Sequence, residues 1–211
     1  VGWSQIRLAG LNERAVVDSY QAGISLQHVG ELCYVLGIVG FGVQDNDVTR
    51  DLNVSTVNGR ARSSLSSWQQ FDYLELGTRI VLGQAELCPY VAGQYIHIGQ
   101  EGTQETGVDP VNLAVGSVNV DSVRSFVGTA WAMPWQTPHG TLTTQLRAAW
   151  MHEYANAYQR VQSSFVGAGG PGVVTTGVHP GRDYGGGGAG LGWNLGAHTS
   201  VFGGYDLMAN G

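Results

Sequence analysis

The chain has 211 residues and a net charge of −6, and only 12% of its residues are charged while 33 are glycine. The charged share is about half the ~25% of soluble domains. The acidic balance offers no basic stripe to neutralise phosphates, which excludes a nucleic-acid partner. No segment has the composition of an interdomain linker, so residues 1–211 are read as a single domain.

Segments in which apolar and polar residues alternate follow one another along the chain, which is the period-2 pattern of β-strands. We expect nine of them: 1–8, 16–28, 32–43, 67–82, 88–99, 121–135, 141–154, 184–195 and 198–208. Short turns are expected at 29–31, 83–85, 136–140 and 196–197. Long polar loops are expected at 44–66, 100–120 and 156–179.

The segment Thr141–Tyr154 shows the alternation most informatively, because its two sets of residues suit two different solvents. Its apolar set is Leu142, Thr144, Leu146, Ala148, Trp150, His152 and Tyr154. The other set includes Arg147 and Glu153. Helical spacing also links three of the apolar residues, but the threonines and the flanking turn Pro138-His139-Gly140 favour a strand. At about 14 residues it far exceeds the usual ~5–6 of soluble strands.

Long strands joined alternately by short turns and long loops are typical of a transmembrane β-barrel. Trp131, Met133, Trp135 and Trp150 lie on apolar faces near strand ends, as the aromatic girdles of membrane proteins do. A soluble antiparallel sandwich also alternates apolar and polar faces. That alternative requires the faces with Leu74, Trp131 and Trp150 to be buried against a second sheet.

Several local motifs occur in a fixed order along the chain. Tyr73–Gly77 reads YLELG, Leu87–Tyr95 reads LCPYVAGQY and Glu101–Gly107 reads EGTQETG. Further motifs follow at Asp121–Ser125, Ala149–Tyr154, Ser164–Gly167 and Gly181–Asp183. Over about residues 18–206 they resemble, in order and spacing, the autotransporter β-domain, the outer-membrane translocator of bacterial type V secretion.

The resemblance implies an all-β, antiparallel up-and-down transmembrane barrel of 12 strands in the bacterial cell outer membrane. It implies secretion or surface display of an N-terminal passenger past a helix in the pore, without catalysis or a cofactor. The implied partners are outer-membrane lipid, the passenger polypeptide, the pore helix and the outer-membrane assembly machinery. The family's first strands, linker helix and closing aromatic strand are not found, so we expect an incomplete barrel with about nine strands.

Two other functions remain open at this point. One is a soluble β-sandwich adhesin or binding module. The other is an outer-membrane barrel hydrolase that uses loop carboxylates at the extracellular rim. The candidate carboxylates are Asp45, Asp47, Glu105 and Asp183. The sequence shows no convergent set of acid, base and nucleophile among them.

The alternation places five charged residues on the polar side of the predicted barrel: Glu75, Arg79, Arg124, Arg147 and Glu153. An Arg that faces lipid at mid-depth costs ~2–4 kcal/mol, so we expect these groups to line the pore. Glu75 and Arg124 are the expected ion pair. The simpler interpretation is that the charges only hold the wall together.

Three further features suggest chemistry at first sight but have simpler interpretations: the neighbours His152 and Glu153, the glycine-rich run and the two cysteines. His152 and Glu153 are consecutive strand residues that face opposite sides, which argues against an acid/base dyad. Gly185–Gly192 contains a G-x-G-x-x-G match without a following helix, and is read as a strand that leaves room in the lumen. Cys33 and Cys88 should be free thiols about 9–10 Å apart, two strand spacings. No metal site is expected.

Overall fold

The computed structural model describes residues 2–8, 13–54, 57–155, 160–167, 172–177, 181–195 and 199–210. Its strands are β1 (Gly2–Leu8), β2 (Glu13–Val29), β3 (Cys33–Val54), β4 (Val57–Thr78), β5 (Ile80–Leu82), β6 (Ala85–Gln100), β7 (Thr103–Gln104), β8 (Leu113–Val115), β9 (Val118–Thr137), β10 (Gly140–Glu153), β11 (Arg160–Phe165), β12 (Val173–Thr176), β13 (Asp183–Asn194) and β14 (Ser200–Asn210). None of the described residues forms a helix long and apolar enough to cross a membrane.

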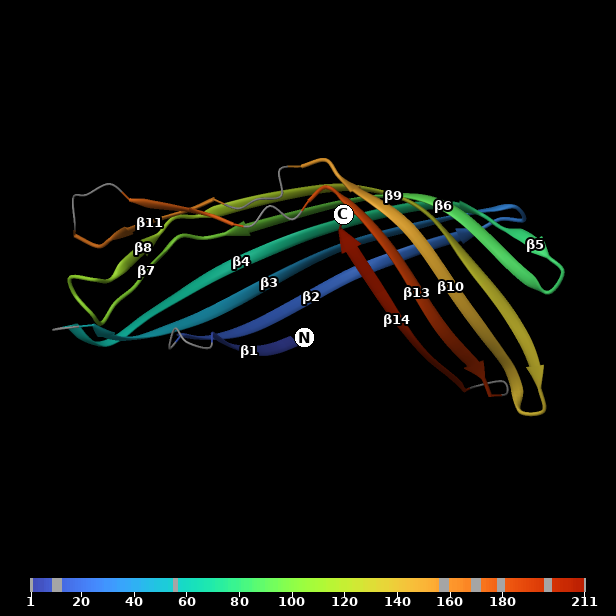
Figure 1. Ribbon diagram of the computed structural model, residues 1–211, viewed down its shortest axis with the longest axis horizontal. Helices are drawn as coiled ribbons and strands as arrows, with labels where there is room; N and C mark the ends of the chain where they lie inside the picture. Colours follow the sequence, from blue (N-terminus) through green and yellow to red (C-terminus); the bar gives the residue numbers. More distant parts are fainter. Residues whose placement is uncertain are drawn as a thin grey trace.

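The main sheet is antiparallel and curls into half a barrel (Figure 1). Its strand order is β1-β2-β3-β4-β6-β9-β10-β13-β14, and β5 pairs with β6 beside this path. Nearly every strand therefore pairs with its neighbour in the chain, as in an up-and-down barrel. The predicted all-β antiparallel architecture is confirmed, and the nine segments expected from the sequence are the nine strands of this order.

The register of the long strands is unbroken. β2 and β3 pair without a gap from Glu13↔Arg50 to Val29↔Tyr34, and β3 and β4 from Cys33↔Thr78 to Val54↔Val57. Because the side-chain period of a strand is two, an unbroken register keeps each residue on the face that its position dictates. The two faces of the sheet can therefore be followed from strand to strand.

Ring contacts identify the concave face. Tyr73 of β4 and Phe126 of β9 lie with ring centroids 6.2 Å apart, although β6 separates their strands. Ala92 of β6 lies between the two rings: it is the direct cross-strand partner of Phe126, and it is two residues along β6 from Gln94, the partner of Tyr73. Side chains converge across an intervening strand on the inner side of a curled sheet. The polar set of each strand, which shares a face with these rings, is therefore concave.

The convex face carries the apolar set and is open. Leu74, Val127, Leu146 and Trp150 are exposed, Leu74 at 53%. The β-sandwich alternative required the faces with Leu74, Trp131 and Trp150 to be buried against a second sheet. Leu74 and Trp150 are exposed and Trp131 is partly exposed, so that expectation is wrong. The apolar belt ends, toward the long loops, at exposed aspartates on the same face: Asp18, Asp45, Asp121 and Asp183.

The long polar stretches are not irregular loops in the described residues. Residues 44–54 and 57–66 extend the β3–β4 hairpin beyond the end of the apolar belt. Parts of 100–120 and 156–179 form a second antiparallel sheet with the order β12-β11-β8-β7. The prediction of loops was wrong because polar residues lie on both faces of these strands, which removes the apolar period from the sequence while cross-strand hydrogen bonding remains.

The second sheet continues the barrel wall at the end of the strands that lies opposite the short turns. β7 follows β6 after Gln100, and β8 leads into β9 at Val118. Arg62 of β4 exchanges both backbone hydrogen bonds with Thr106, each at 3.0 Å, which ties the second sheet to the β3–β4 extension. We call this part, formed by β7, β8, β11, β12 and the extended hairpin, the upper tier.

Short turns occur at the opposite end of the strands. Gly83 and Gly140 adopt positive φ angles of 67° and 126°, which glycine tolerates without strain. The predicted strand 67–82 is interrupted at Arg79, after which β5 pairs with β6. The turn expected at 196–197 lies outside the described residues.

Candidate functional site on the concave face

A carboxylate held by tyrosines lies near the middle of the concave face. Tyr34 donates a hydrogen bond of 2.7 Å to Glu75 Oε1, and Tyr73 donates to the other oxygen. Among the described residues no cation lies within ion-pair distance of Glu75. The two tyrosines satisfy part of the acceptor capacity of a carboxylate, which has about four lone-pair sites. Glu75 can therefore accept further donors from the concave side.

The expected Glu75–Arg124 pair does not form. Arg124 Nε instead donates to Glu153 Oε2 at 2.9 Å, and Arg124 also contacts Gln94 at 3.4 Å. Arg124 and Glu153 are direct cross-strand partners of β9 and β10, whereas β6 separates Arg124 from Glu75. Adjacent partners on one face are closer than residues two strands apart, which decides the pairing.

Glu153 is the most buried large side chain of the chain's described part, at 2% exposure. It also accepts hydrogen bonds from the Ser122 hydroxyl at 2.5 Å, the Val123 N–H at 2.9 Å and the Ala155 N–H at 3.1 Å. A buried carboxylate with four donors is fully satisfied. It holds together the end of β10 and the start of β9, where the main sheet meets the upper tier.

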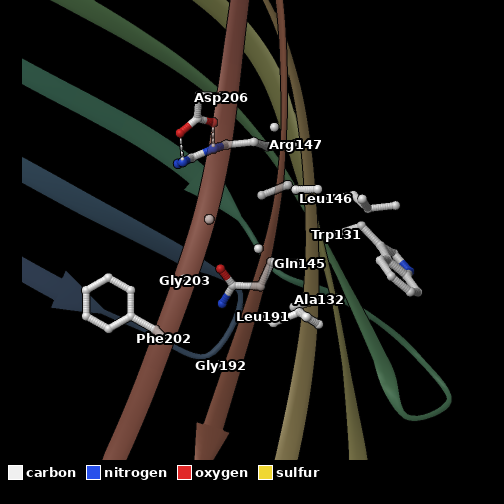
Figure 2. Close-up of a pocket in the computed structure, with 15 residues that line it drawn as sticks. Trp131, Ala132, Gln145, Leu146, Arg147, Leu191, Gly192, Phe202, Gly203 and Asp206 are labelled. Atoms are coloured by element: carbon white, nitrogen blue, oxygen red, sulfur yellow. Dashed lines mark hydrogen bonds and ion pairs between the residues drawn. The ribbon is translucent and has the colours of Figure 1, made fainter.

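Arg147 forms a two-pronged ion pair with Asp206 of β14. Its Nε lies 2.6 Å from Oδ1 and its second nitrogen 2.5 Å from Oδ2. Figure 2 shows this fork crossing β13, with Gln145 and Phe202 on the same side of the sheet and Trp131 on the other. Both side chains are more than half exposed, so the pair contributes little to stability. It fixes a charged group at the surface of a cavity of about 650 Å³.

The fork can cross β13 because the middle of this strand, from Gly186 to Gly192, has no side chains on its concave face. Gly186, Gly188, Gly190 and Gly192 alternate with the outward residues and share the face of Arg147. A Cβ on Gly188 would lie 2.0 Å from Asp206 Oδ1. The glycine-rich run is thus a strand that leaves the inner side of the wall open, as the sequence predicted.

Arg79 lies at the short-turn end and pairs with Glu86 at the start of β6. Both side chains are about one-third exposed. Glu86 shares the concave face with Cys88 and Tyr90, because all three alternate along β6. Cys88 is therefore concave, and Cys33 is exposed on the convex face; both thiols are free, as expected.

Aromatic rings cover glycines of neighbouring strands, which the sequence reading did not find. A Cβ placed on Gly40 would approach the Phe71 ring to 2.1 Å, and one on Gly128 would approach the Tyr90 ring to 2.5 Å. Tyr34 covers Gly77 in the same way, at 2.4 Å. The signal was available in the sequence only once the register had placed each glycine opposite its ring.

The convex face holds two imidazole–carboxylate pairs at the border of the apolar belt. His152 Nδ1 lies 2.8 Å from Asp183, and His97 Nδ1 lies 2.7 Å from Asp121. His152 and Glu153 face opposite sides and have different partners, so they do not form a dyad. Asp183 and Glu105, two of the carboxylates proposed for a hydrolase, are held by different partners.

The upper tier is anchored by an ion pair of low exposure. Arg50 of β3 pairs through both nitrogens with Glu105, whose carboxylate also accepts the Leu113 N–H at 2.9 Å. At the hairpin tip Arg60 Nε lies 2.6 Å from Asp51 Oδ1. The hydrogen bond from Arg60 holds the pKa of Asp51 below its ordinary value.

The sequence was compared with protein-family models and with functionally curated proteins. The model of the autotransporter β-domain matches residues 1–206. No curated protein matches the chain.

Proposed function

The chain belongs to the autotransporter β-domain family, and from this premise we propose that it secretes or displays an N-terminal passenger polypeptide across the bacterial outer membrane. The family is one of outer-membrane translocator domains. We further propose that residues 1–211 act as one domain, with outer-membrane lipid on the convex face and the passenger on the concave face. The assembly machinery of the outer membrane would insert it.

One observation carries this proposal: the two faces of the main sheet suit two different solvents. The convex face presents apolar side chains such as Leu74, Val127 and Leu146. The concave face presents Glu75, Arg147 and the bare glycines of β13. A charge on the lipid side of a barrel at mid-depth costs ~2–4 kcal/mol, whereas a polar inner face accommodates water and a passing chain.

We propose that Glu75, Arg79, Arg124, Arg147 and Glu153 belong to the inner, pore-facing side, with different roles. Glu153 is buried with Arg124, so this pair holds the wall at the border with the upper tier. Glu75 and Arg147 have their charges directed to the open inner side, where a pore helix or passenger can meet them. Arg79 closes the short-turn end with Glu86.

The proposal is tested by expressing the complete reading frame in a Gram-negative host. A passenger epitope should become accessible to protease added outside intact cells, and the barrel should shift its gel mobility on boiling. A passenger that stays inside while the barrel is inserted and heat-modifiable would contradict secretion. A β-sandwich module would instead appear in the soluble fraction without any mobility shift.

A further inference from the structure

Exposed apolar side chains of the upper tier have no explanation in lipid contact. Phe165 is 51% exposed and Val173 63%. They lie beyond the exposed aspartates that end the convex apolar belt: Asp121 lies near the start of β9, which begins at Val118, and Asp183 is the first residue of β13. Apolar surface that meets neither lipid nor core marks an interaction site.

The register assigns these residues to faces. Val173 pairs with Ser163, Ser163 with Val115, and Val115 with Thr103. Thr103 alternates with Glu105, whose side chain reaches Arg50. Arg50 in turn shares the face of Tyr34 along the unbroken β3.

The inner face of the upper tier is therefore the upward continuation of the concave face. Leu113 and Phe165 are cross-strand partners on this same side. Val174 is the next residue after Val173 and points to the opposite side. A polypeptide that leaves the concave side of the barrel passes Leu113, Phe165 and Val173 first.

This surface is fixed in place before any partner arrives. The Glu105 carboxylate is 10% exposed and links β3 to the β8 strand through Arg50 and the Leu113 N–H. Asn112, at 4% exposure, accepts the Val108 N–H at 3.0 Å, and its carbonyl accepts the Val166 N–H at 2.8 Å. Because these residues are already ordered, binding of a chain does not incur the free-energy cost of ordering this surface.

β12 adds a strand edge beside these side chains. It reads Val-Val-Thr-Thr, and all four residues are exposed. Within the described residues it pairs with β11 alone, so its other edge lies at the end of the second sheet. Natural edge strands are usually blocked by Pro, charge or a bulge. β12 is only four residues long, but it carries no Pro, charge or bulge, so it can pair through its backbone with a short extended segment.

We propose that the upper tier binds an extended, apolar-rich segment of the polypeptide that leaves the pore, which adds to β12 and packs on Val173, Phe165 and Leu113. The proposal rests on the secretory function proposed above. It adds to that function a binding partner for the upper tier, which is the emerging polypeptide itself. Binding there would hold the emerging chain outside and bias its movement outward, because each bound segment can no longer slide back.

Photo-crosslinking distinguishes the two faces of β12. A photoreactive phenylalanine analogue replaces Val173 or Val174 in the complete reading frame, and the passenger is stalled in the pore by a folded reporter. Val173 and Val174 are the same residue type with similar exposure, so the second is a matched control. We expect the passenger to crosslink severalfold more at 173 than at 174. Equal yields at both positions would overturn the proposal.

Lysine substitutions measure the consequence for export. Val173→Lys should slow the appearance of passenger at the cell surface severalfold, while Val174→Lys should leave it unchanged. Both variants must first show wild-type amounts of heat-modifiable barrel, which separates a binding defect from a folding defect. Normal export by Val173→Lys would sink the inference but leave the secretory function intact. A passenger that the unsubstituted protein never exports would instead refute the secretory function.

Discussion

Leu146 and Gln145 offer the sharpest test of the two-solvent wall, since they are neighbours on β10 with opposite faces. Leu146 is 53% exposed on the convex side, and Gln145 lies on the concave side beside the Arg147–Asp206 fork (Figure 2). Both positions lie at the middle of the strand Gly140–Glu153. We therefore compare Leu146→Lys with Gln145→Lys.

The expected loss of stability in Leu146→Lys follows from the depth of Leu146 in the membrane. A 14-residue strand at ~3.3 Å per residue is about 46 Å long, and a tilt of about 40° reduces its span across the membrane to about 35 Å. Leu146 therefore lies near mid-depth, where a lysine costs ~2–4 kcal/mol. Loss of the half-exposed leucine from lipid adds roughly 1 kcal/mol. In total Leu146→Lys should lower the free energy of unfolding by about 3–5 kcal/mol.

Gln145→Lys places the same charge on the aqueous side, and the cost of a polar surface substitution is within about 0.5 kcal/mol. The assay is urea unfolding of the complete domain in lipid vesicles, followed by tryptophan fluorescence and by gel mobility without boiling. The control is the same pair in detergent, where a lysine can reach water at the micelle surface and the difference should shrink. If both variants unfold at the same urea concentration in vesicles, the assignment of faces is refuted.

Two further comparisons use the same assay. Glu153→Ala removes a buried carboxylate from its arginine and three other donors, so it should lower the free energy of unfolding by about 3–5 kcal/mol. Glu75→Ala leaves only two tyrosine hydroxyls unpaired and should lower it by about 1–2 kcal/mol. Equal losses of stability would show that burial does not decide the roles of these carboxylates. Gly128→Ala places a Cβ 2.5 Å from the Tyr90 ring and should lower the free energy of unfolding by about 1–3 kcal/mol. Gly93→Ala is the control, because its Cβ would have no atom within 4 Å, and its stability should be close to that of the unsubstituted protein. A Gly128→Ala variant of unchanged stability would mean that the Tyr90 ring moves aside without penalty.

The faces of the membrane-level strands could be predicted from the sequence because each strand separates two solvents. On β10 the alternation placed Leu146 and Trp150 on one face and Arg147 and Glu153 on the other, and the structure places them so. Lipid imposes this contrast over the whole length of the strand, so the signal accumulates over many residues. The nine strands on the main path of the large sheet could be predicted for the same reason, whereas β5 and the four strands of the second sheet were not.

The upper tier could not be predicted, because there the contrast disappears. At the start of this region Gln44 and Asn46 lie on one face of β3 while Asp45 and Asp47 lie on the other, which leaves no apolar period to detect. The ion-pair partner of Arg124 also could not be predicted from the alternation of apolar and polar residues. A face assignment states which residues share a side, but not which strand lies next to which, and Glu153 became the partner only through the β9–β10 register.

The contrast between Glu75 and Glu153 shows how one face can hold carboxylates for two purposes. Glu153 lies where β9 and β10 pass into the upper tier, and its four donors include two backbone N–H groups, Val123 and Ala155. Such a group fixes the chain path and has no capacity left for a moving partner. Glu75 has only side-chain donors and lies lower on the wall. Under the secretory function proposed above, a passing cationic residue would therefore compete for Glu75 without disturbing the backbone, so that the wall could stay closed while a chain moves past it.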